Sequence, residues 1–144
     1  LSTDTKYLIL DEPTANFDPD FKQDFLNVIM QFMESGKKSV IIASHILDEL
    51  DRIADYLIYL DKGELVYSGD IESFRDKYRI ISGETYKVKL LKQEDIIHVE
   101  DRKYGTKALV VNHGYSKYDG ALTVTVPTLE EFMYHYSKRG ESVI

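Results

Sequence analysis

The chain has 144 residues, 43% of them hydrophobic and 30% charged, a composition typical of globular proteins that bury a core. It contains no cysteine, which excludes disulfides and thiolate metal sites, and no apolar run long enough for a membrane-spanning helix. The net charge is −7 and its acidic excess falls within the first 80 residues, a pattern that disfavours nucleic acid as a partner.

The first predicted element is a strand over Lys6–Leu10, followed at once by the carboxylates of Asp11 and Glu12. The apolar residues of this strand follow one another without alternation, which is typical of a strand buried on both faces of a parallel sheet. Adjacent residues on a strand point to opposite faces, so the two carboxylates have different environments if the strand continues. An acid pair at the carboxyl end of a strand suits a shared task, in which one carboxylate holds Mg²⁺ and the other orients a water molecule.

A helix is predicted next, with Asp18 as its N-cap, Pro19 as its first residue and Gly36 at its C-terminal end. The apolar residues predicted for its buried face have helical spacing: Phe21, Phe25, Val28, Ile29 and Phe32. After this helix, Ser39–Ala43 is predicted as a second buried strand. The order so far is strand, helix, strand.

The segment that follows is predicted to end in an antiparallel pair. Its elements are a helix from about Leu47 to Ala54, a hairpin of Tyr56–Leu60 and Glu64–Tyr67 around Asp61–Gly63, and a short helix from Asp70 to about Tyr78. This alternation predicts an α/β fold, a parallel sheet with an antiparallel edge. Because ligand groups gather at the carboxyl ends of parallel strands, Asp11, Glu12 and His45 are the candidate site residues.

A linker is predicted over Ile80–Glu84, which divides the chain into residues 1–80 and residues 81–144. The second part is predicted to be a small α+β module, with strands over Tyr86–Leu90, Lys107–Val111 and Ala121–Val126. Its final helix begins at Thr128, which forms a T-x-x-E capping box with Glu131. The apolar face predicted for this helix consists of Leu129, Phe132, Met133 and Tyr136.

Three histidines of this second part, His98, His113 and His135, have no metal-ligand spacing and no paired acid beside them. They are predicted to pack or to lie on the surface. The tyrosines of the same region are predicted to pack as well, because no basic patch accompanies them.

Three short motifs of residues 1–80 resemble those of ABC-type ATPases. Asp11-Glu12-Pro13-Thr14 resembles the Walker B motif, Ala15-Asn16-Phe17-Asp18 the D-loop, and Ala43-Ser44-His45 the H-loop. They occur in the family's order and spacing, and the hairpin over Tyr59–Gly69 resembles the segment that follows the H-loop. The D-loop departs from the common S-G-L-D, which puts its coupling role in doubt. The resemblance covers residues 1 to about 80.

The resemblance implies a role for each matching residue. Asp11 would hold Mg²⁺ through its water shell, and Glu12 would be the general base that polarises the attacking water. His45 would donate a hydrogen bond to the γ-phosphate of ATP. Asp18 would help to couple two sites across a dimer, beside its role as a helix cap.

Two motifs of such ATPases do not occur in the sequence: the G-x-x-x-x-G-K-[ST] phosphate loop (Walker A) and the L-S-G-G-Q-like signature. The expected fold is therefore the second half of an ABC ATPase parallel-sheet core, of the P-loop class, followed by the α+β module. The chain begins with Leu1 just before the Walker B strand, so we expect a C-terminal part of a longer ATPase. By itself it is expected to be inactive and to self-associate through an uncovered apolar face.

The intact protein is expected to be the ATP-hydrolysing subunit of an ABC transporter, at the cytoplasmic face of the membrane. Its expected partners are transmembrane permease subunits and a second ATPase subunit, and its cofactors are ATP and Mg²⁺. Thr128–Met133 resembles the last helix of exporter-type ATPases, which favours export. The alternatives are a non-transport ABC-type ATPase of repair, chromosome organisation or translation, and a regulatory or interaction module formed by residues 81–144.

Overall fold

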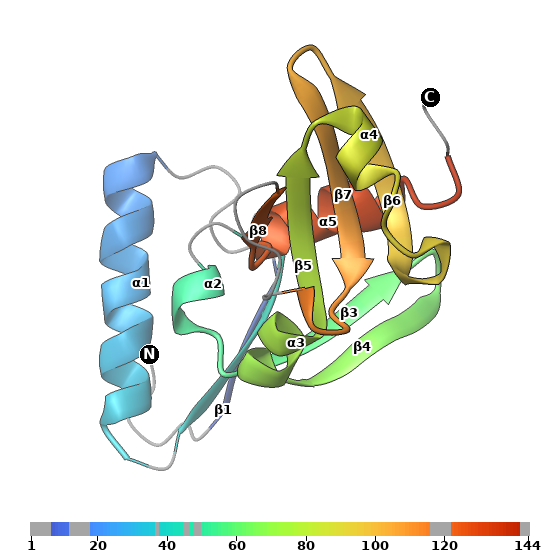
Figure 1. Cartoon of the computed structure of the whole chain (residues 1–144). Coiled ribbons are helices and arrows are strands. Elements are labelled where there is room, and N and C mark those ends of the chain that lie inside the picture. The colour runs from blue at the N-terminus through green and yellow to red at the C-terminus, as the bar shows by residue number, and fades with distance from the viewer. Residues whose placement is uncertain are drawn as a thin grey trace. The chain divides into compact units, whose positions relative to one another are not determined.

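The computed structural model describes residues 7–11, 18–36, 38–44, 47, 50–115 and 122–141. The chain forms two compact units, Leu1–Ile53 and Ala54–Ile144. The first unit contains β1 (Tyr7–Asp11), α1 (Pro19–Glu34), β2 (Ser39–Ala43) and α2 (Leu50–Ile53) (Figure 1). The second contains β3 (Tyr56–Asp61), β4 (Glu64–Asp70), α3 (Ile71–Lys77), β5 (Tyr78–Gly83), α4 (Thr85–Val88), the 3-10 helix η1 (Gln93–Asp95), β6 (Ile96–Arg102), β7 (Gly105–Val111), β8 (Leu122–Thr125) and α5 (Leu129–Ser137).

In the first unit, β1 and β2 form a two-stranded parallel sheet, as the alternation of elements predicts. Their burial differs from the prediction, because the residues alternate between exposed and half-buried along both strands. The side chains of Tyr7, Ile9 and Ile41 are 70%, 74% and 58% exposed. The reason is that the described residues cover one face of this sheet and leave the other open.

The helix α1 begins at the predicted residue, but the face that it buries differs from the predicted one. Its N-cap is Asp18, whose Oδ1 accepts a hydrogen bond from the Phe21 backbone N–H at 2.9 Å. The side chain of Phe21 is 63% exposed and that of Val28 is also exposed, so the predicted apolar face is wrong at these two positions. The buried residues are Leu26, Ile29 and Phe32, which lie three apart and form a narrower stripe.

The predicted hairpin and its following helix are confirmed in the second unit. β3 and β4 pair antiparallel around a two-residue turn of Lys62 and Gly63, both with positive φ (50° and 78°). Such a turn matches the twist of the strands it joins. β4 leads directly into α3, where the Asp70 carboxylate accepts a hydrogen bond from the Ser73 backbone N–H at 2.8 Å.

The linker predicted over Ile80–Glu84 is wrong, because most of it belongs to β5. This strand lies between β7 and β8 in an antiparallel sheet of order β6-β7-β5-β8. Ser82 and Gly83 resemble linker residues, yet they pair with Lys107 and Thr106 of β7. Residue 80 is thus inside a sheet, and the boundary between the two compact units falls at residues 53 and 54.

Two other elements of this unit differ from the prediction. The strand predicted over Tyr86–Leu90 is wrong, because α4 occupies Thr85–Val88 and buries only Val88. One apolar residue between two lysines fits a single helical turn as well as a strand. The strand β6, between α4 and β7, was not predicted. The strand predicted over Lys107–Val111 and the helix after Thr128 are confirmed.

Residues on the two faces of the four-stranded sheet contribute to two apolar clusters. One contains Ile81, Val88, Leu91, Ala108, Val110 and Tyr115. The other is aromatic, and its rings are those of Tyr59, Phe74, Tyr78, Phe132 and Tyr136. Figure 1 shows α4 in front of this sheet and α5 behind it. Among the helices of the described residues, none has both the length and the apolar character that a membrane crossing requires.

Candidate functional site

The predicted site lies at the carboxyl ends of β1 and β2. Asp11 is the last residue of β1, and its Cα pairs in register with Ala43, the last residue of β2. Because the strands are parallel, the chain leaves both of them at the same edge of the sheet. Asp11 is exposed there, and Ser44 follows β2 directly. Glu12 and His45 lie outside the described residues, so their placement stays a prediction.

Asp18 has a confirmed structural role at the start of α1. Its backbone is extended (φ −72°, ψ 167°) and its side chain accepts the hydrogen bond that caps the helix. A second carboxylate, that of Asp20, lies in the first turn, where negative charge complements the helix dipole. The predicted contribution of Asp18 to nucleotide-site coupling is a separate matter and stays a prediction.

The donor chemistry at this sheet edge fits a loosely bound Mg²⁺. The residues that the structure describes include no group of three or more His, Asp or Glu side chains placed to hold a metal. Mg²⁺, however, keeps several of its waters and is held in proteins by one or two carboxylates together with substrate phosphates. The exposed carboxylate of Asp11 offers acceptor oxygens of this kind.

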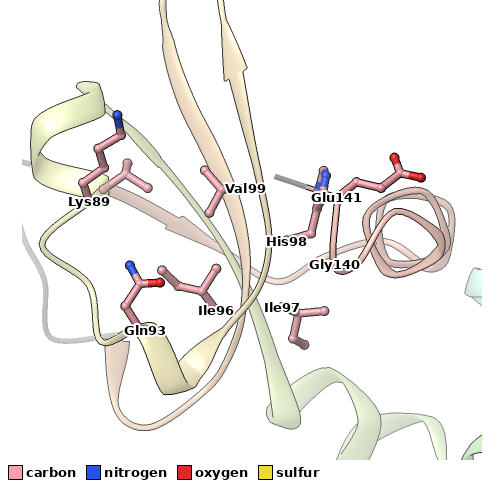
Figure 2. A pocket seen from close by; sticks show the side chains of 9 residues that line it. Lys89, Gln93, Ile96, Ile97, His98, Val99, Gly140 and Glu141 are labelled. Carbon is pink, nitrogen blue, oxygen red and sulfur yellow. The ribbon is translucent and has the colours of Figure 1, made fainter. Parts of the chain in front are cut away.

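The second unit contains a shallow pocket of about 210 Å³ beside β6 (Figure 2). It is lined by Val88, Lys89, Gln93, Ile96, Ile97, His98, Val99, Gly140 and Glu141. The lining is largely apolar, and its one imidazole, His98, already contacts a second histidine. This set contains no nucleophile paired with a base, so the pocket does not resemble a hydrolytic site.

Sequence reasoning missed a buried carboxylate in this unit, that of Asp95, which is 1% exposed. It accepts hydrogen bonds from the Tyr115 hydroxyl and from His113 Nδ1, the latter at 2.6 Å. The Tyr115 hydrogen bond is the main reason that the pKa of Asp95 lies below its ordinary value, and His113 lowers it further. These hydrogen bonds connect η1 to His113 and Tyr115, which follow β7. Asp95 follows Gln93 and Glu94 in a polar run, so no sequence signal marks it as buried.

Of the three histidines predicted to pack or lie on the surface, two are buried. His98 of β6 and His135 of α5 are 3% and 2% exposed, and their Nδ1 atoms lie 2.9 Å apart. The packing prediction is thus confirmed for both. Helical spacing could have identified His135, because it lies three residues after Phe132 and six after Leu129, the other buried residues of α5.

Comparisons with known proteins find relatives of part of the chain. No protein-family model matches the chain. A Mycoplasma pneumoniae protein described as an ABC transporter ATP-binding protein is 41% identical over 69 residues, 48% of this chain and 21% of that protein. This chain is related to ABC transporter ATP-binding proteins. The relation is partial, because the chain spans only about a quarter of the length of its relatives.

Two further relatives are energy-coupling factor transporter ATP-binding proteins, both named EcfA2. The one from Caldanaerobacter subterraneus is 41% identical over 76 residues, which is 52% of this chain and 27% of that protein. The one from Streptococcus pyogenes is 33% identical over 69 residues, 48% of this chain and 24% of that protein. The relatives' names specify ATP binding and transport. They give no support for export.

Proposed function

We propose that this chain is part of the ATP-binding and ATP-hydrolysing subunit of an ABC transporter. The observation that carries the proposal is its relation, over about 70 residues, to ABC transporter ATP-binding proteins. The parallel pairing of β1 and β2 supports it, because Asp11 and Ala43 end neighbouring strands at the same edge. The chain leads from these two residues into Glu12 and into Ser44-His45.

We assign separate roles to the two adjacent carboxylates. Asp11 would accept hydrogen bonds from the water shell of Mg²⁺, which fits its exposure at the strand end. Glu12 would accept a proton from the attacking water, and His45 would donate a hydrogen bond to the γ-phosphate. Bound MgATP supplies the phosphoryl group that is transferred to water. Asp18 would add a contact across a dimer of such subunits.

The proposed partners follow from the same relation. They are membrane-spanning permease subunits and a second ATPase subunit, which would place the protein at the cytoplasmic face of the membrane. The four-stranded sheet of β5 to β8, together with α5, would be an accessory module of the subunit. Export rests on the resemblance of Thr128–Met133 alone and stays a prediction. A non-transport ABC-type ATPase is the alternative, and the transporter names of the relatives favour the first proposal.

The test measures ATP turnover by the purified product of the reading frame that encodes this chain. Replacing Glu12 with Gln keeps the shape of the side chain and removes its basicity. We expect turnover to fall by about 10²–10⁴-fold, the usual contribution of a general base. If the product has only these 144 residues, no turnover is expected from either form, because the phosphate loop is missing.

The matched control is Asp20→Asn, which removes an exposed carboxylate of α1. It should leave ATP turnover within about twofold, because a change at an exposed side chain has little effect on the fold. An active wild-type protein whose Glu12→Gln variant keeps full turnover would refute the assigned base. ATP turnover by the 144-residue chain alone would refute the expectation that a phosphate loop is required.

A further inference from the structure

The strongest unassigned feature of the molecule is the pair of buried histidines that joins α5 to β6. His98 lies in the middle of β6 and His135 near the end of α5, and both side chains are almost fully buried. Their Nδ1 atoms are 2.9 Å apart, a hydrogen-bond distance, and their ring centroids are 5.1 Å apart. One Nδ1 therefore carries a hydrogen that it donates to the other.

The remaining ring nitrogen of His98 indicates which imidazole donates. His98 Nε2 is buried and has no hydrogen-bond partner. A buried N–H without an acceptor is rarer in proteins than an unpaired acceptor. The favoured arrangement is thus one in which His98 donates from Nδ1 to His135 Nδ1 and keeps a bare lone pair on Nε2.

Neither available nitrogen accepts a proton without cost in this arrangement. A proton on His98 Nε2 would create a buried cation whose new N–H has no acceptor. A proton on His135 Nδ1 would set two N–H groups against each other across 2.9 Å. Accordingly, burial lowers the pKa of both imidazoles. Together with the neighbouring His98, it lowers the pKa of His135 to about 4.

The charged groups around the pair do not offset this cost. In the described residues they come from β6, β7 and the turn after α5: Glu100, Arg102, Lys107, Lys138 and Glu141. Three are cations that disfavour a charged imidazole and two are carboxylates that favour one. One of the two carboxylates, Glu100, already accepts hydrogen bonds from Tyr134 at 2.5 Å and from Arg102 at 2.9 Å.

Other contacts of α5 persist at mildly acidic pH. The hydrogen bond from Tyr134 lowers the pKa of Glu100, so this carboxylate stays charged. Arg139, just beyond the helix, forms an ion pair with Asp61 of β3 at 2.5 Å. Phe132 packs against the rings of Tyr59 and Phe74, and burial raises the pKa of the Tyr59 phenol, so neither ring changes its charge at mildly acidic pH. Among these described contacts, the histidine pair alone is weakened by gaining protons between neutral pH and pH 4.

We propose that the His98–His135 pair is a pH-sensitive latch, which holds α5 against β6 while both imidazoles are neutral and releases α5 when the pair is protonated. The direction of this pH dependence follows from the number of protons that each state binds. Histidines in the released state have their ordinary pKa, near 6.5, so below that pH the released state binds more protons. The latch is therefore fully closed above pH 6.5 and weakens as the pH falls. The inference is independent of the ATPase proposal.

The test is hydrogen exchange of the α5 amides in the full 144-residue chain, between pH 7.5 and 5 and corrected for the intrinsic exchange rate. Amides of the central strand β7 are the internal reference. We expect α5 protection to fall by about tenfold or more relative to β7. The double variant His98→Gln/His135→Gln keeps hydrogen-bonding side chains that do not titrate in this range. In this variant, the protection of α5 relative to that of β7 should not change with pH.

The control variant is His113→Gln, which replaces a histidine whose side chain is 63% exposed and should leave the α5 response intact. If the double variant fails to fold, the imidazole titrations of the wild-type chain by NMR decide the matter. Values for His98 and His135 at or above 6.5 would overturn the latch. The latch would also be overturned if, in the wild-type chain, the amide protection of α5 changed in parallel with that of β7 at every pH.

Discussion

Replacing Phe132 with Ala should remove a large part of the stability of the second unit. Phe132 is 1% exposed and lies at the centre of the aromatic cluster. Its ring contacts Tyr78, Phe74, Tyr136 and Tyr59 at centroid distances of 4.6, 4.8, 5.2 and 5.6 Å. It thus connects α5 to the hairpin, to α3 and to β5.

The expected loss in the free energy of unfolding is about 4 kcal/mol. A buried Phe→Ala change typically costs about 3–5 kcal/mol, which includes the cavity left behind. Aromatic pairs contribute roughly 0.5–1.5 kcal/mol each beyond their buried area, so four ring partners favour the upper half of that range. Domains of this size are stable by only about 5–15 kcal/mol in total.

The assay is urea unfolding followed by tyrosine signals. These report on the second unit, because Tyr7 is the one tyrosine of the chain outside it. The matched control is Tyr104→Ala, which also truncates an aromatic ring but one that is 91% exposed, and it should cost less than about 0.5 kcal/mol. Equal losses in the two variants would refute the central role assigned to Phe132.

Two further predictions concern other parts of the chain. Because Ile9 and Ile41 are exposed on the open face of the β1–β2 sheet, the 144-residue chain should self-associate, and Ile9→Lys should reduce the association. A wild-type chain that sediments as a monomer at high concentration would contradict this. Thr128→Ala removes one half of the capping box of α5 and should cost about 1 kcal/mol in urea unfolding, whereas the exposed Thr123→Ala should cost less. No difference between the two would refute the stabilising role of the cap.

The elements with strong local signals were predictable from the sequence. The cap at Asp18, the turn at Lys62-Gly63 and the capping box at Thr128 each depend on a few adjacent residues, and the structure has all three. The parallel pairing of β1 and β2 was predictable from the strand–helix–strand order.

The errors arose where tertiary context decides the structure. β5 contains Ser82 and Gly83, which local reasoning assigns to a linker, but pairing with β7 and β8 makes this segment the inside of a sheet. The burial of Asp95 depends on partners about twenty residues away, His113 and Tyr115. For the candidate site, the sequence correctly predicted a strand before Glu12, although the observed strand includes Asp11, which was predicted to follow it.

We propose that Asp11 and Glu12 have different tasks, one at the metal and the other at the attacking water. The most direct measurement compares the ATP affinity of the reading-frame product with Mg²⁺ and with EDTA, for Asp11→Asn and Glu12→Gln. We expect Glu12→Gln to keep the Mg²⁺-dependent part of the ATP affinity and Asp11→Asn to lose it. An Asp11→Asn protein that binds ATP with the full Mg²⁺ dependence of the wild type would contradict the claim.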